Sequence, residues 1–180
     1  DVRDFKIKSL RQKIGFIRQK TLLFTGSIKS NIKFGKQEAS HDEVVESAKT
    51  AQAYDFISKK ELKFDEPIGE GGSNVSGGQK QRLSIARALV RKPEIYIFDD
   101  SFSALDFKTD AILRAELKKE TADAIVLIVA QRIGSIMEAD KIIVLDEGKV
   151  VGCGKHKELL KSCSVYKEIA LSQLTEEELA

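Results

Sequence analysis

The stretch Ser76–Leu89 constrains the fold of this chain most, because it combines a flexible turn with the start of a helix. Ser76 and Gln79 have the S-x-x-Q spacing of a capping box, in which two side chains satisfy the first backbone N–H groups. Apolar residues then recur at helical spacing, beginning with Leu83 and Ala86. A glycine-lined helix N-terminus with a serine hydroxyl is also suited to an anion, because the N–H groups and the helix dipole point outward. Taken alone, the stretch fits an ordinary capped helix equally well.

A strand that ends in two acids follows this predicted helix. Ile95–Phe98 is a continuous β-rich run, typical of a parallel strand covered on both faces. Asp99 and Asp100 follow at its carboxyl end, where open α/β sheets place their functional sites. Core packing explains such a pair poorly, so the two carboxylates predict a functional site.

Three motifs, in this order and spacing, resemble those of the ATP-binding-cassette (ABC) family. Val75–Arg82 is similar to the family signature L-S-G-G-Q-x-Q-R, Ile95–Asp100 resembles the Walker B strand, and Ser103–Asp106 resembles the D-loop. The resemblance implies an α/β fold, with a P-loop NTPase-like (RecA-like) ABC ATPase core and a helical subdomain. No stretch matches G-x-x-x-x-G-K-[ST], the loop that holds phosphates. By resemblance, the core is expected to lack its N-terminal strands and this Walker A phosphate loop.

The resemblance covers nearly all of residues 1–180 and describes them as one partial nucleotide-binding domain. It assigns 1–24 to the core up to the Q-loop and 25–90 to the helical subdomain with the signature. Residues 91–180 are expected to hold Walker B, the D-loop, the switch region and the C-terminal helices. The residue pattern further predicts elements at these positions: a strand over 14–18, helices from Ser40 and over Tyr54–Ser58, a helix over 107–119, strands over 124–130 and 141–145, a three-residue hairpin turn at 146–148, and a closing helix through Leu174.

Individual roles follow from the same resemblance. Asp99 is expected to hold Mg²⁺ through water, and Gln19, in the Q-loop position, to reach the metal and the attacking water. Asp100 stands where the family normally has a glutamate that polarises this water, and Gln131 stands where it has the switch histidine that contacts the γ-phosphate. The signature residues would contact ATP bound by a partner domain: Ser76, Gly77, Gly78 and Gln79. The D-loop residues belong to the same nucleotide-binding set: Ser103, Ala104, Leu105 and Asp106.

The two departures from the family pattern affect the same chemistry. Asp100 is one methylene shorter than glutamate, which draws the carboxylate away from the water, and general-base help is typically worth about 10²–10⁴-fold in rate. Gln131 can hydrogen-bond a phosphate but cannot carry an imidazolium charge. The pairing resembles one half of a heterodimeric ABC exporter, whose own ATP site is impaired while its intact signature serves the partner's site.

We therefore expect a region that binds and hydrolyses ATP to energise membrane export, with ATP and Mg²⁺ as cofactors, at the cytoplasmic face of the cell membrane. Expected partners are a second nucleotide-binding domain from a different subunit and the coupling helices of a transmembrane domain. Exporter-like stretches at 22–35 and 66–72 support this reading, although Gly71 replaces the arginine most common there. Without Walker A, the 180-residue chain is expected to be inactive alone, whereas its parent would be an ABC-type ATPase.

Two other functions fit the same motifs. One is a soluble, non-transport ABC ATPase that acts on DNA or ribosomes. The other is a non-catalytic, truncated cassette that serves only as an interaction module.

Composition and charge pattern narrow the classes of protein to which the chain can belong. The sequence has no apolar run of transmembrane length and no signal-peptide pattern. Its two cysteines lack metal-ligand spacing and disulfide density, which fits a reducing cytosol.

Residues 1–36 hold ten Lys or Arg against two acids, a balance of +8, but the charges alternate with apolar residues and lack aromatic interleaving. A solvated face, or one covering a missing portion of the domain, is therefore expected rather than a nucleic-acid patch. His41 and His156, in polar surroundings, are expected at the surface.

Overall fold

The computed structural model describes residues 1–175, in two compact units that divide after Val129. Unit 1 is Asp1–Val129, and unit 2 begins at Ala130. The helices and strands of unit 1 are α1 (Ile7–Gln12), β1 (Ile14–Ile17), β2 (Gly26–Ser27), α2 (Ile28–Lys33), α3 (His41–Thr50), α4 (Tyr54–Ser58), β3 (Pro67–Ile68), α5 (Gly77–Leu89), β4 (Ile95–Asp99), α6 (Phe107–Glu120) and β5 (Ile125–Val129). Short 3₁₀ turns lie at Val2–Asp4, Lys63–Asp65 and Glu70–Gly72.

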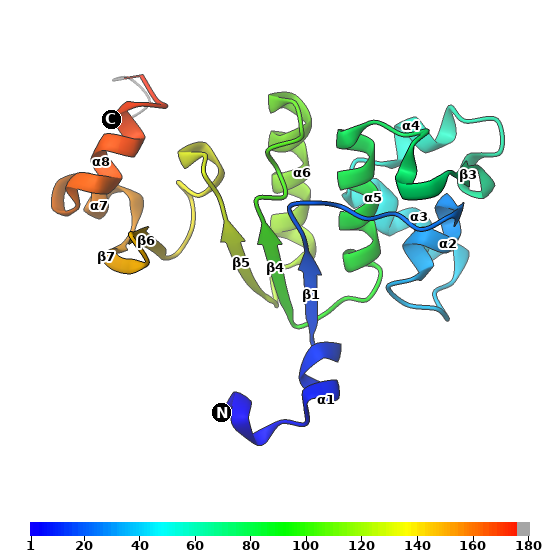
Figure 1. The fold of residues 1–180 in the computed structure, drawn as a ribbon, viewed down its shortest axis with the longest axis horizontal. Helices are drawn as coiled ribbons and strands as arrows, with labels where there is room; N and C mark the ends of the chain where they lie inside the picture. The colour runs from blue at the N-terminus through cyan, green and yellow to red at the C-terminus, as the bar shows by residue number, and fades with distance from the viewer. Residues whose placement is uncertain (176–180) are drawn as a thin grey trace. The chain divides into compact units, whose positions relative to one another are not determined.

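A three-stranded parallel sheet forms the centre of unit 1, in the order β1-β4-β5 (Figure 1). Phe98 of β4 lies opposite Ile17 of β1 and Ile128 of β5. The predicted acid-ending strand is therefore the middle strand, and its carboxyl end meets those of its neighbours. This confirms the expected α/β fold. The assignment of 1–24, 25–90 and 91–180 to subdomains stays a prediction.

One face of this sheet carries the hydrophobic core. Ile17, Tyr96 and Phe98 point to that face and share a core cluster with residues of α5 and α6, among them Leu83 and Leu113. Alternation along a strand sends the intervening side chains to the opposite face. The core of unit 1 therefore lies between the sheet and these two helices.

The opposite face of the sheet, which we call the apolar sheet face, is formed by the rows Phe16–Ile97–Leu127 and Ile14–Ile95–Ile125. Phe16 is 53% exposed and Leu127 is 51% exposed. On β4 itself, Ile95 and Ile97 are half-buried, so the expectation that this strand is covered on both faces is confirmed on the core face and met only in part on this one. The long apolar run of β5 does form a strand, but its side chains are mostly exposed.

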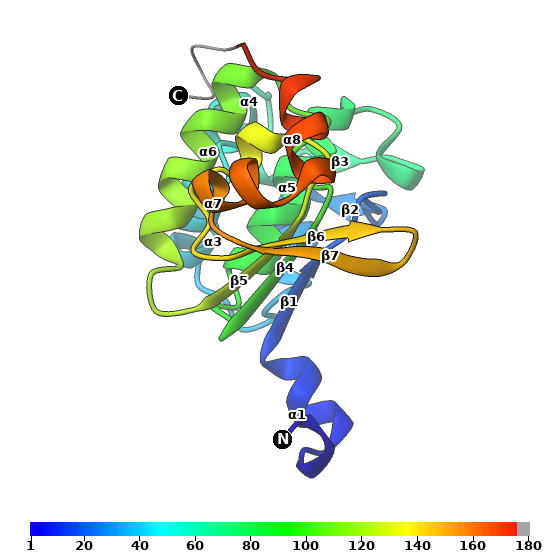
Figure 2. The same cartoon turned by 90° about the vertical axis from the view of Figure 1, so that its left-hand side faces the viewer.

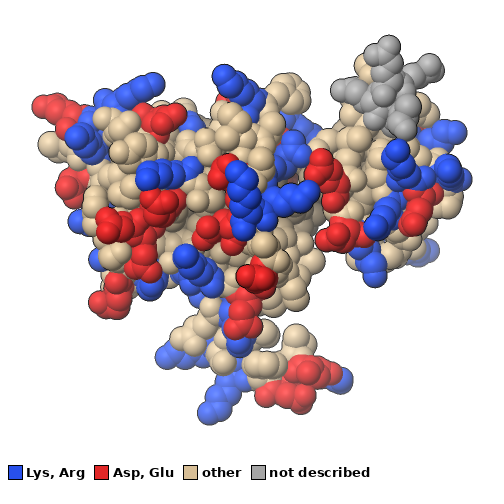
Figure 3. All heavy atoms as spheres, turned by 180° about the vertical axis from the view of Figure 1, so that it is seen from behind, with Lys and Arg blue, Asp and Glu red and all other residues tan. Residues whose placement is uncertain are grey.

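The helices of unit 1 follow local signals in the sequence. Ser40 and Glu43 form a capping box at the start of α3, and α4 occupies the predicted Tyr54–Ser58. The apolar stripe of α3 is fully buried at Val44 and Ala48. None of the described helices combines the length and apolar character needed to span a bilayer. On the face drawn in Figure 3, basic and acidic side chains are intermixed across unit 1.

Unit 2 contains a 3₁₀ turn at Ile133–Ser135, then an antiparallel hairpin and two helices (Figure 2). The strands are β6 (Ile142–Asp146) and β7 (Lys149–Gly154), and the helices are α7 (His156–Ser162) and α8 (Ser164–Leu171). The closing helix ends at Leu171, three residues before the predicted Leu174. The predicted three-residue hairpin turn is also wrong: only Glu147 and Gly148 connect the strands, both with positive φ (44° and 76°), as two-residue turns of the I′ kind require.

His156 corrects a second expectation in unit 2. The side chain is only 7% exposed, and its Nδ1 lies 2.8 Å from the hydroxyl oxygen of Tyr166. Burial lowers the pKa of His156, with Lys157 acting in the same direction. Polar neighbours in sequence predicted a surface residue, but the packing of α7 against α8 turns the ring inward. His41, in contrast, is exposed as predicted.

Candidate functional site

The acid pair lies in a strained turn at the end of β4. Asp100 has φ 44°, a left-handed conformation that is uncommon for non-glycine residues and that persists only where the surroundings impose it. Its N–H donates to the carbonyl of Val129 at 2.9 Å. Next to it, the buried Ser101 hydroxyl donates to the carbonyl of Ile17 at 3.0 Å. The turn is thus tied to both neighbouring strands, and these ties fix where the two carboxylates emerge.

Gln19 reaches Asp100 across the carboxyl end of the sheet. Its Nε2 donates to Oδ2 of Asp100 at 3.1 Å, although the two residues are 81 positions apart in the chain. Gln19 follows β1 and Asp100 follows β4, so the parallel register of the two strands brings them together. Two residues predicted to act on the same water are therefore in direct contact.

The donors at this point fit a magnesium ion. Asp99 and Asp100 offer carboxylate oxygens, and the Gln19 amide, whose nitrogen is used on Asp100, can offer its oxygen. Oxygen donors are what Mg²⁺ prefers, and it is usually held by one or two carboxylates together with water and substrate phosphates. Among the described residues, no group of three or more His, Cys, Asp or Glu is arranged to hold a metal by itself.

The signature forms the N-terminus of α5. The Ser76 N–H donates to Oε1 of Gln79 at 3.1 Å, and the Gln79 N–H donates to the Ser76 hydroxyl at 3.3 Å, which confirms the predicted capping box. Ser76 and Gly77 are exposed, and a methyl group built on Gly77 would meet nothing within 4 Å. This helix end therefore presents its first turn to whatever approaches from outside.

The D-loop packs directly against the signature. A Cβ at Gly78 would lie 3.2 Å from the carbonyl oxygen of Ala104 and 3.6 Å from Cδ2 of Leu105, so only glycine fits without displacing the loop. The Ser103 hydroxyl donates to the carbonyl of Asp100 at 3.0 Å. The D-loop thus connects the acid turn with the signature.

Asp106 ends the D-loop and begins the next helix. Its Oδ1 accepts from the Thr109 N–H at 2.9 Å, which caps α6, and this hydrogen bond lowers the pKa of Asp106. The cap fixes the point at which the D-loop joins α6.

Arg82 fastens the first turns of α5 to the helical part of unit 1. Its Nη1 donates to the carbonyl of Gln52 at 2.7 Å, its Nε donates to that of Gly78 at 3.3 Å, and its guanidinium lies 4.9 Å from the ring centroid of Phe56. Burial lowers the pKa of Arg82, and the charge of Asp106 opposes this shift.

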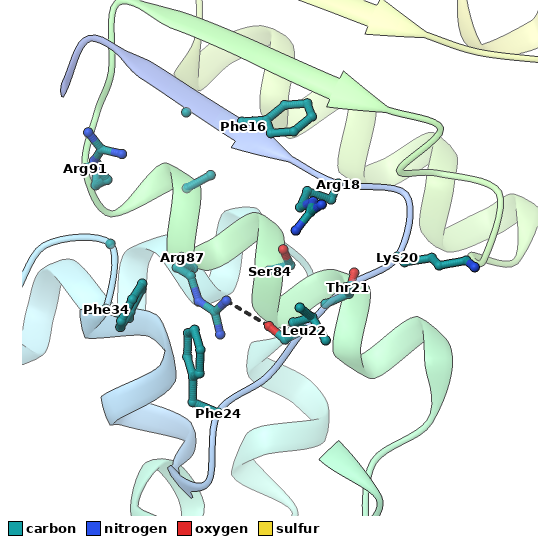
Figure 4. A pocket seen from close by; sticks show the side chains of 13 residues that line it. Phe16, Arg18, Lys20, Thr21, Leu22, Phe24, Phe34, Ser84, Arg87 and Arg91 are labelled. Carbon is teal, nitrogen blue, oxygen red and sulfur yellow. Dashed lines mark hydrogen bonds between the residues drawn. The ribbon is translucent and has the colours of Figure 1, made fainter. Parts of the chain in front are cut away.

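A pocket of about 270 Å³ opens between β1 and α5 (Figure 4). Its lining is aromatic and basic: Phe16, Phe24, Phe34, Arg18, Arg87 and Arg91. Arg87 lies 5.1 Å from the ring centroid of Phe24 and 5.7 Å from that of Phe34, and it donates to the Leu22 carbonyl at 2.9 Å. Burial lowers the pKa of Arg87. An apolar group that carries an acceptor or a negative charge would complement this lining.

Several residues that shape the site are absent from the sequence-based predictions. Asn31 is fully buried and bonds the backbone of Phe24 with both its amide atoms, and Arg87 donates to it. The Thr21 hydroxyl donates to the buried Gln81 of α5. Asn31 lies within the exporter-like stretch 22–35, but nothing in the sequence singled it out, and no local signal pairs Thr21 with Gln81.

Gln131 lies near the start of unit 2. Its side chain is exposed, and its carbonyl accepts from Nε2 of Gln173 at 2.8 Å. Oε1 of Gln173 in turn accepts from the N–H of Ile133 at 2.9 Å. Gln173 therefore fixes the backbone of Gln131 while leaving its side chain at the surface.

The chain is similar in sequence to known proteins. Residues 1–103 match the model of the family described as ABC transporter. The chain is 46% identical over 176 residues to an uncharacterized ABC transporter ATP-binding protein of Bacillus subtilis strain 168, covering 98% of this chain and 30% of that protein. It is 42% identical over 182 residues to multidrug resistance protein 1 of Entamoeba histolytica, covering 99% of this chain and 14% of that protein.

The structure is similar to that of a bacterial Atm1-family ABC exporter with ATP bound. The TM-score is 0.90 at 37% identity, covering 94% of this chain and 30% of that chain. The chain thus spans about a third or less of the length of the proteins it matches.

Proposed function

The chain belongs to the ABC transporter family, and from this premise we propose that it binds and hydrolyses ATP to energise export by a larger membrane protein. The observation that carries the proposal is the contact between Gln19 and Asp100 at 3.1 Å, beside Asp99 at the end of the central strand. It joins the Q-loop and Walker B positions in one site. The fold similarity to an ABC exporter supports the same function.

Within this site, Asp99 and the amide oxygen of Gln19 would hold Mg²⁺. Bound there, the ion would neutralise charge on the transferred phosphoryl group. Gln19 orients Asp100 through its hydrogen bond, and Asp100 accepts the proton of the attacking water. The aspartate has one methylene less than glutamate, so it reaches this water poorly, and Gln131 supplies no imidazolium charge. We therefore propose that this chain's own ATP site is slow.

The signature has the opposite character. Ser76, Gly77, Gly78 and Gln79 form an intact helix N-terminus, exposed at Ser76 and Gly77, which is suited to a phosphate group. We propose that it contacts ATP held by a second nucleotide-binding domain, and that the D-loop residues Ser103, Ala104, Leu105 and Asp106 lie at the same interface. A slow own site together with an intact signature is the combination expected of one half of a heterodimer.

The pocket of Figure 4 suits the transmembrane partner. Its walls include Leu22 and Phe24, which follow the Q-loop position, so a helix seated there would touch the segment that carries Gln19. We propose that coupling helices of a transmembrane domain meet this pocket and the turn at Gly69–Gly72. The chain would then work at the cytoplasmic face of the membrane.

Alanine variants of Ser76 and Asp100 test the asymmetry. In the full-length protein with its partner, Ser76→Ala should lower the ATPase rate about tenfold or more, because it removes a positioned phosphate contact. Asp100→Ala should cost less than about twofold, since a slow site has little turnover to lose. Ser58→Ala, an exposed serine at the end of α4, is the control. Equal losses from Ser76→Ala and Asp100→Ala would contradict the unequal pair.

A further inference from the structure

We infer that Gln81 is a positioning residue for Gln19. Gln81 lies on the helix that carries the signature, and its hydrogen bond with Thr21 attaches a loop to that helix. The same loop carries Gln19, which contacts Asp100. This inference rests on the proposed function, because it concerns hydrolysis at the same ATP site. It adds a physical connection between that site and the signature of the same chain.

Gln81 and Thr21 each lie two residues away from the motif that they connect, the signature and the Q-loop respectively. Gln81 lies two residues after Gln79 on α5, and its side chain is only 3% exposed. Thr21 lies two residues after Gln19, at the point where the loop passes α5 (Figure 4). The Thr21 hydroxyl donates to Oε1 of Gln81. One hydrogen bond thus connects the signature helix directly to the Q-loop.

The loop around Gln19 is held at both ends. On one side, the Ile17 carbonyl accepts from Ser101 at 3.0 Å, and Ile17 is paired with Phe98 in the sheet. On the other side, Thr21 is held by Gln81, and the next carbonyl, of Leu22, accepts from Arg87 at 2.9 Å. Gln19 lies midway between Ile17 and Thr21, so the position of Thr21 constrains the backbone from which the Gln19 amide reaches Asp100.

The amide of Gln81 is only half satisfied, which packing alone does not explain. Its Nε2 is buried and has no hydrogen-bond partner among the described residues. Because the Thr21 hydroxyl can donate or accept, turning the amide over would leave Oε1 unpartnered instead. A buried polar atom without a partner is costly, and a leucine of similar size would avoid that cost. Glutamine at this position is therefore best explained by its bond to Thr21.

Gln81 and Arg82 attach the same turn of α5 to different parts of unit 1. Arg82 binds the carbonyl of Gln52 in the helical part, whereas Gln81 binds the loop beside the sheet. A shift of the signature when it contacts a partner's ATP would therefore displace Thr21 and, with it, Gln19. The nucleotide at the partner's site would in this way adjust the geometry of the site in this chain.

Hydrogen exchange in the nucleotide-free, full-length protein tests the connection without relying on activity. Thr21→Val removes the hydroxyl and keeps the shape, so amides of residues 18–20 should exchange about five-fold faster, the factor expected for one hydrogen bond. Thr21→Ser keeps the hydroxyl and should restore slow exchange. Thr25→Val makes the same chemical change at an exposed threonine of the same segment and is the matched control.

Steady-state kinetics then test the link to Gln19, with the catalytic site of any unlike partner subunit silenced. Thr21→Val should lower kcat several-fold and leave the KM for ATP unchanged, because Gln19 acts on the reaction rather than on ATP binding. In a Gln19→Ala background, Thr21→Val should have no further effect. Gln81→Leu should match Thr21→Val, and the double variant should be no worse than either, since both remove the same bond.

Distinct results would overturn the inference. Unchanged exchange and kcat in Thr21→Val, while Gln19→Ala lowers kcat, would overturn this inference alone. The same holds if Thr21→Val lowers kcat equally with and without Gln19. A wild-type protein without ATPase activity would overturn the proposed function and this inference together. Since Thr21→Val is isosteric and Thr21→Ser conservative, the comparison stands even if Gln81→Leu fails to fold.

Discussion

At the scale of single residues, a side-chain hydrogen bond and a left-handed backbone angle constrain the carboxylate of Asp100. Its Oδ2 accepts from Nε2 of Gln19, and its φ of 44° places its backbone in the left-handed region. Both features set the direction of the carboxylate, but neither adds length. A longer acid at the same position would reach further toward the water that we propose it activates.

We predict that Asp100→Glu combined with Gln131→His raises turnover at this chain's own ATP site. In the roles that we propose for these two positions, glutamate would reach the attacking water and histidine would offer the γ-phosphate a group that can carry charge. The gain should fall within about 10²–10⁴-fold, the range for general-base help. Either change alone should recover less than the pair, because residues that act as a unit are non-additive.

The measurement is the ATPase rate of the full-length protein in a dimer whose other site is inactivated. The comparison is with Asp100→Asn, which keeps the size and removes the base. A rate that stays at the starting value with both changes present would show that another step or group limits this site.

His156 yields a prediction about pH. Burial lowers its pKa in the folded unit, so the unfolded chain binds the proton more readily. Unit 2 should therefore keep its full stability above pH ~6.5, the ordinary histidine pKa, and lose stability as the pH falls below that value toward the lowered one. Hydrogen exchange in α7 and α8 at pH 7.5 and 5.5 measures the effect.

In His156→Gln the protection factors of these amides, which are exchange rates corrected for their intrinsic pH dependence, should stay the same over that window, because glutamine can still bond Tyr166 but does not titrate there. His41→Gln, at an exposed histidine, is the matched control and should leave the pH dependence in place. If His156→Gln kept the same pH dependence as the wild type, another group would be responsible.

At the scale of elements, α5 organises unit 1. Its N-terminus is the signature, Gln81 and Arg87 hold the loop after β1, and its C-terminal half packs on α2. Gly35, just after α2, shows how close that approach is: a Cβ there would lie 1.9 Å from the Arg87 carbonyl oxygen. The backbones of Gly35 and Arg87 can approach so closely only because residue 35 has no side chain.

We predict that Gly35→Ala destabilises unit 1 by about 1–3 kcal/mol or more, the usual cost of overpacking. The observable is a lower Tm of the protein, together with faster hydrogen exchange in α2 and α5. Gly134→Ala is the matched control, because a Cβ at Gly134 meets nothing within 4 Å. Similar effects of the two variants would mean that the α2–α5 approach relaxes easily.

The elements also show which parts of the structure the sequence can predict. The capping boxes at Ser40 and Ser76 depend on residues three positions apart, so their pattern is visible in the chain. The acids after β4 are visible because a strand of apolar residues precedes them. Contacts across the fold are not visible in this way: the bond of Gln19 to Asp100 and that of Thr21 to Gln81 join residues 81 and 60 positions apart.

Other differences arise where packing overrides local character. His156 stands among charged neighbours, yet α8 covers it. The hairpin after Asp146 is one residue shorter than predicted, because Glu147 adopts a left-handed conformation that residue type alone did not indicate. The family resemblance placed Gln19 in the site, since a single glutamine after a strand carries no signal of its own.

At the scale of the whole molecule, the 180 residues contain the acids, the signature and the D-loop, but no stretch that matches the phosphate loop G-x-x-x-x-G-K-[ST]. We predict that residues 1–180, prepared alone, bind Mg-ATP more weakly than micromolar, because Asp99 by itself cannot hold a triphosphate. Calorimetry with Mg-ATP measures this, with the full-length protein as the positive control. Micromolar affinity of the 180 residues alone would contradict the prediction.

The apolar sheet face has a thermodynamic consequence for unit 1. Its rows of Phe, Leu and Ile side chains remain in contact with water in the described chain, so their transfer free energy is not yet gained. Any surface that covers them would bind the folded sheet and not the unfolded chain, and by mass action it would raise the stability of unit 1. The melting temperature of unit 1 is therefore a property of the assembly around it as much as of its own sequence.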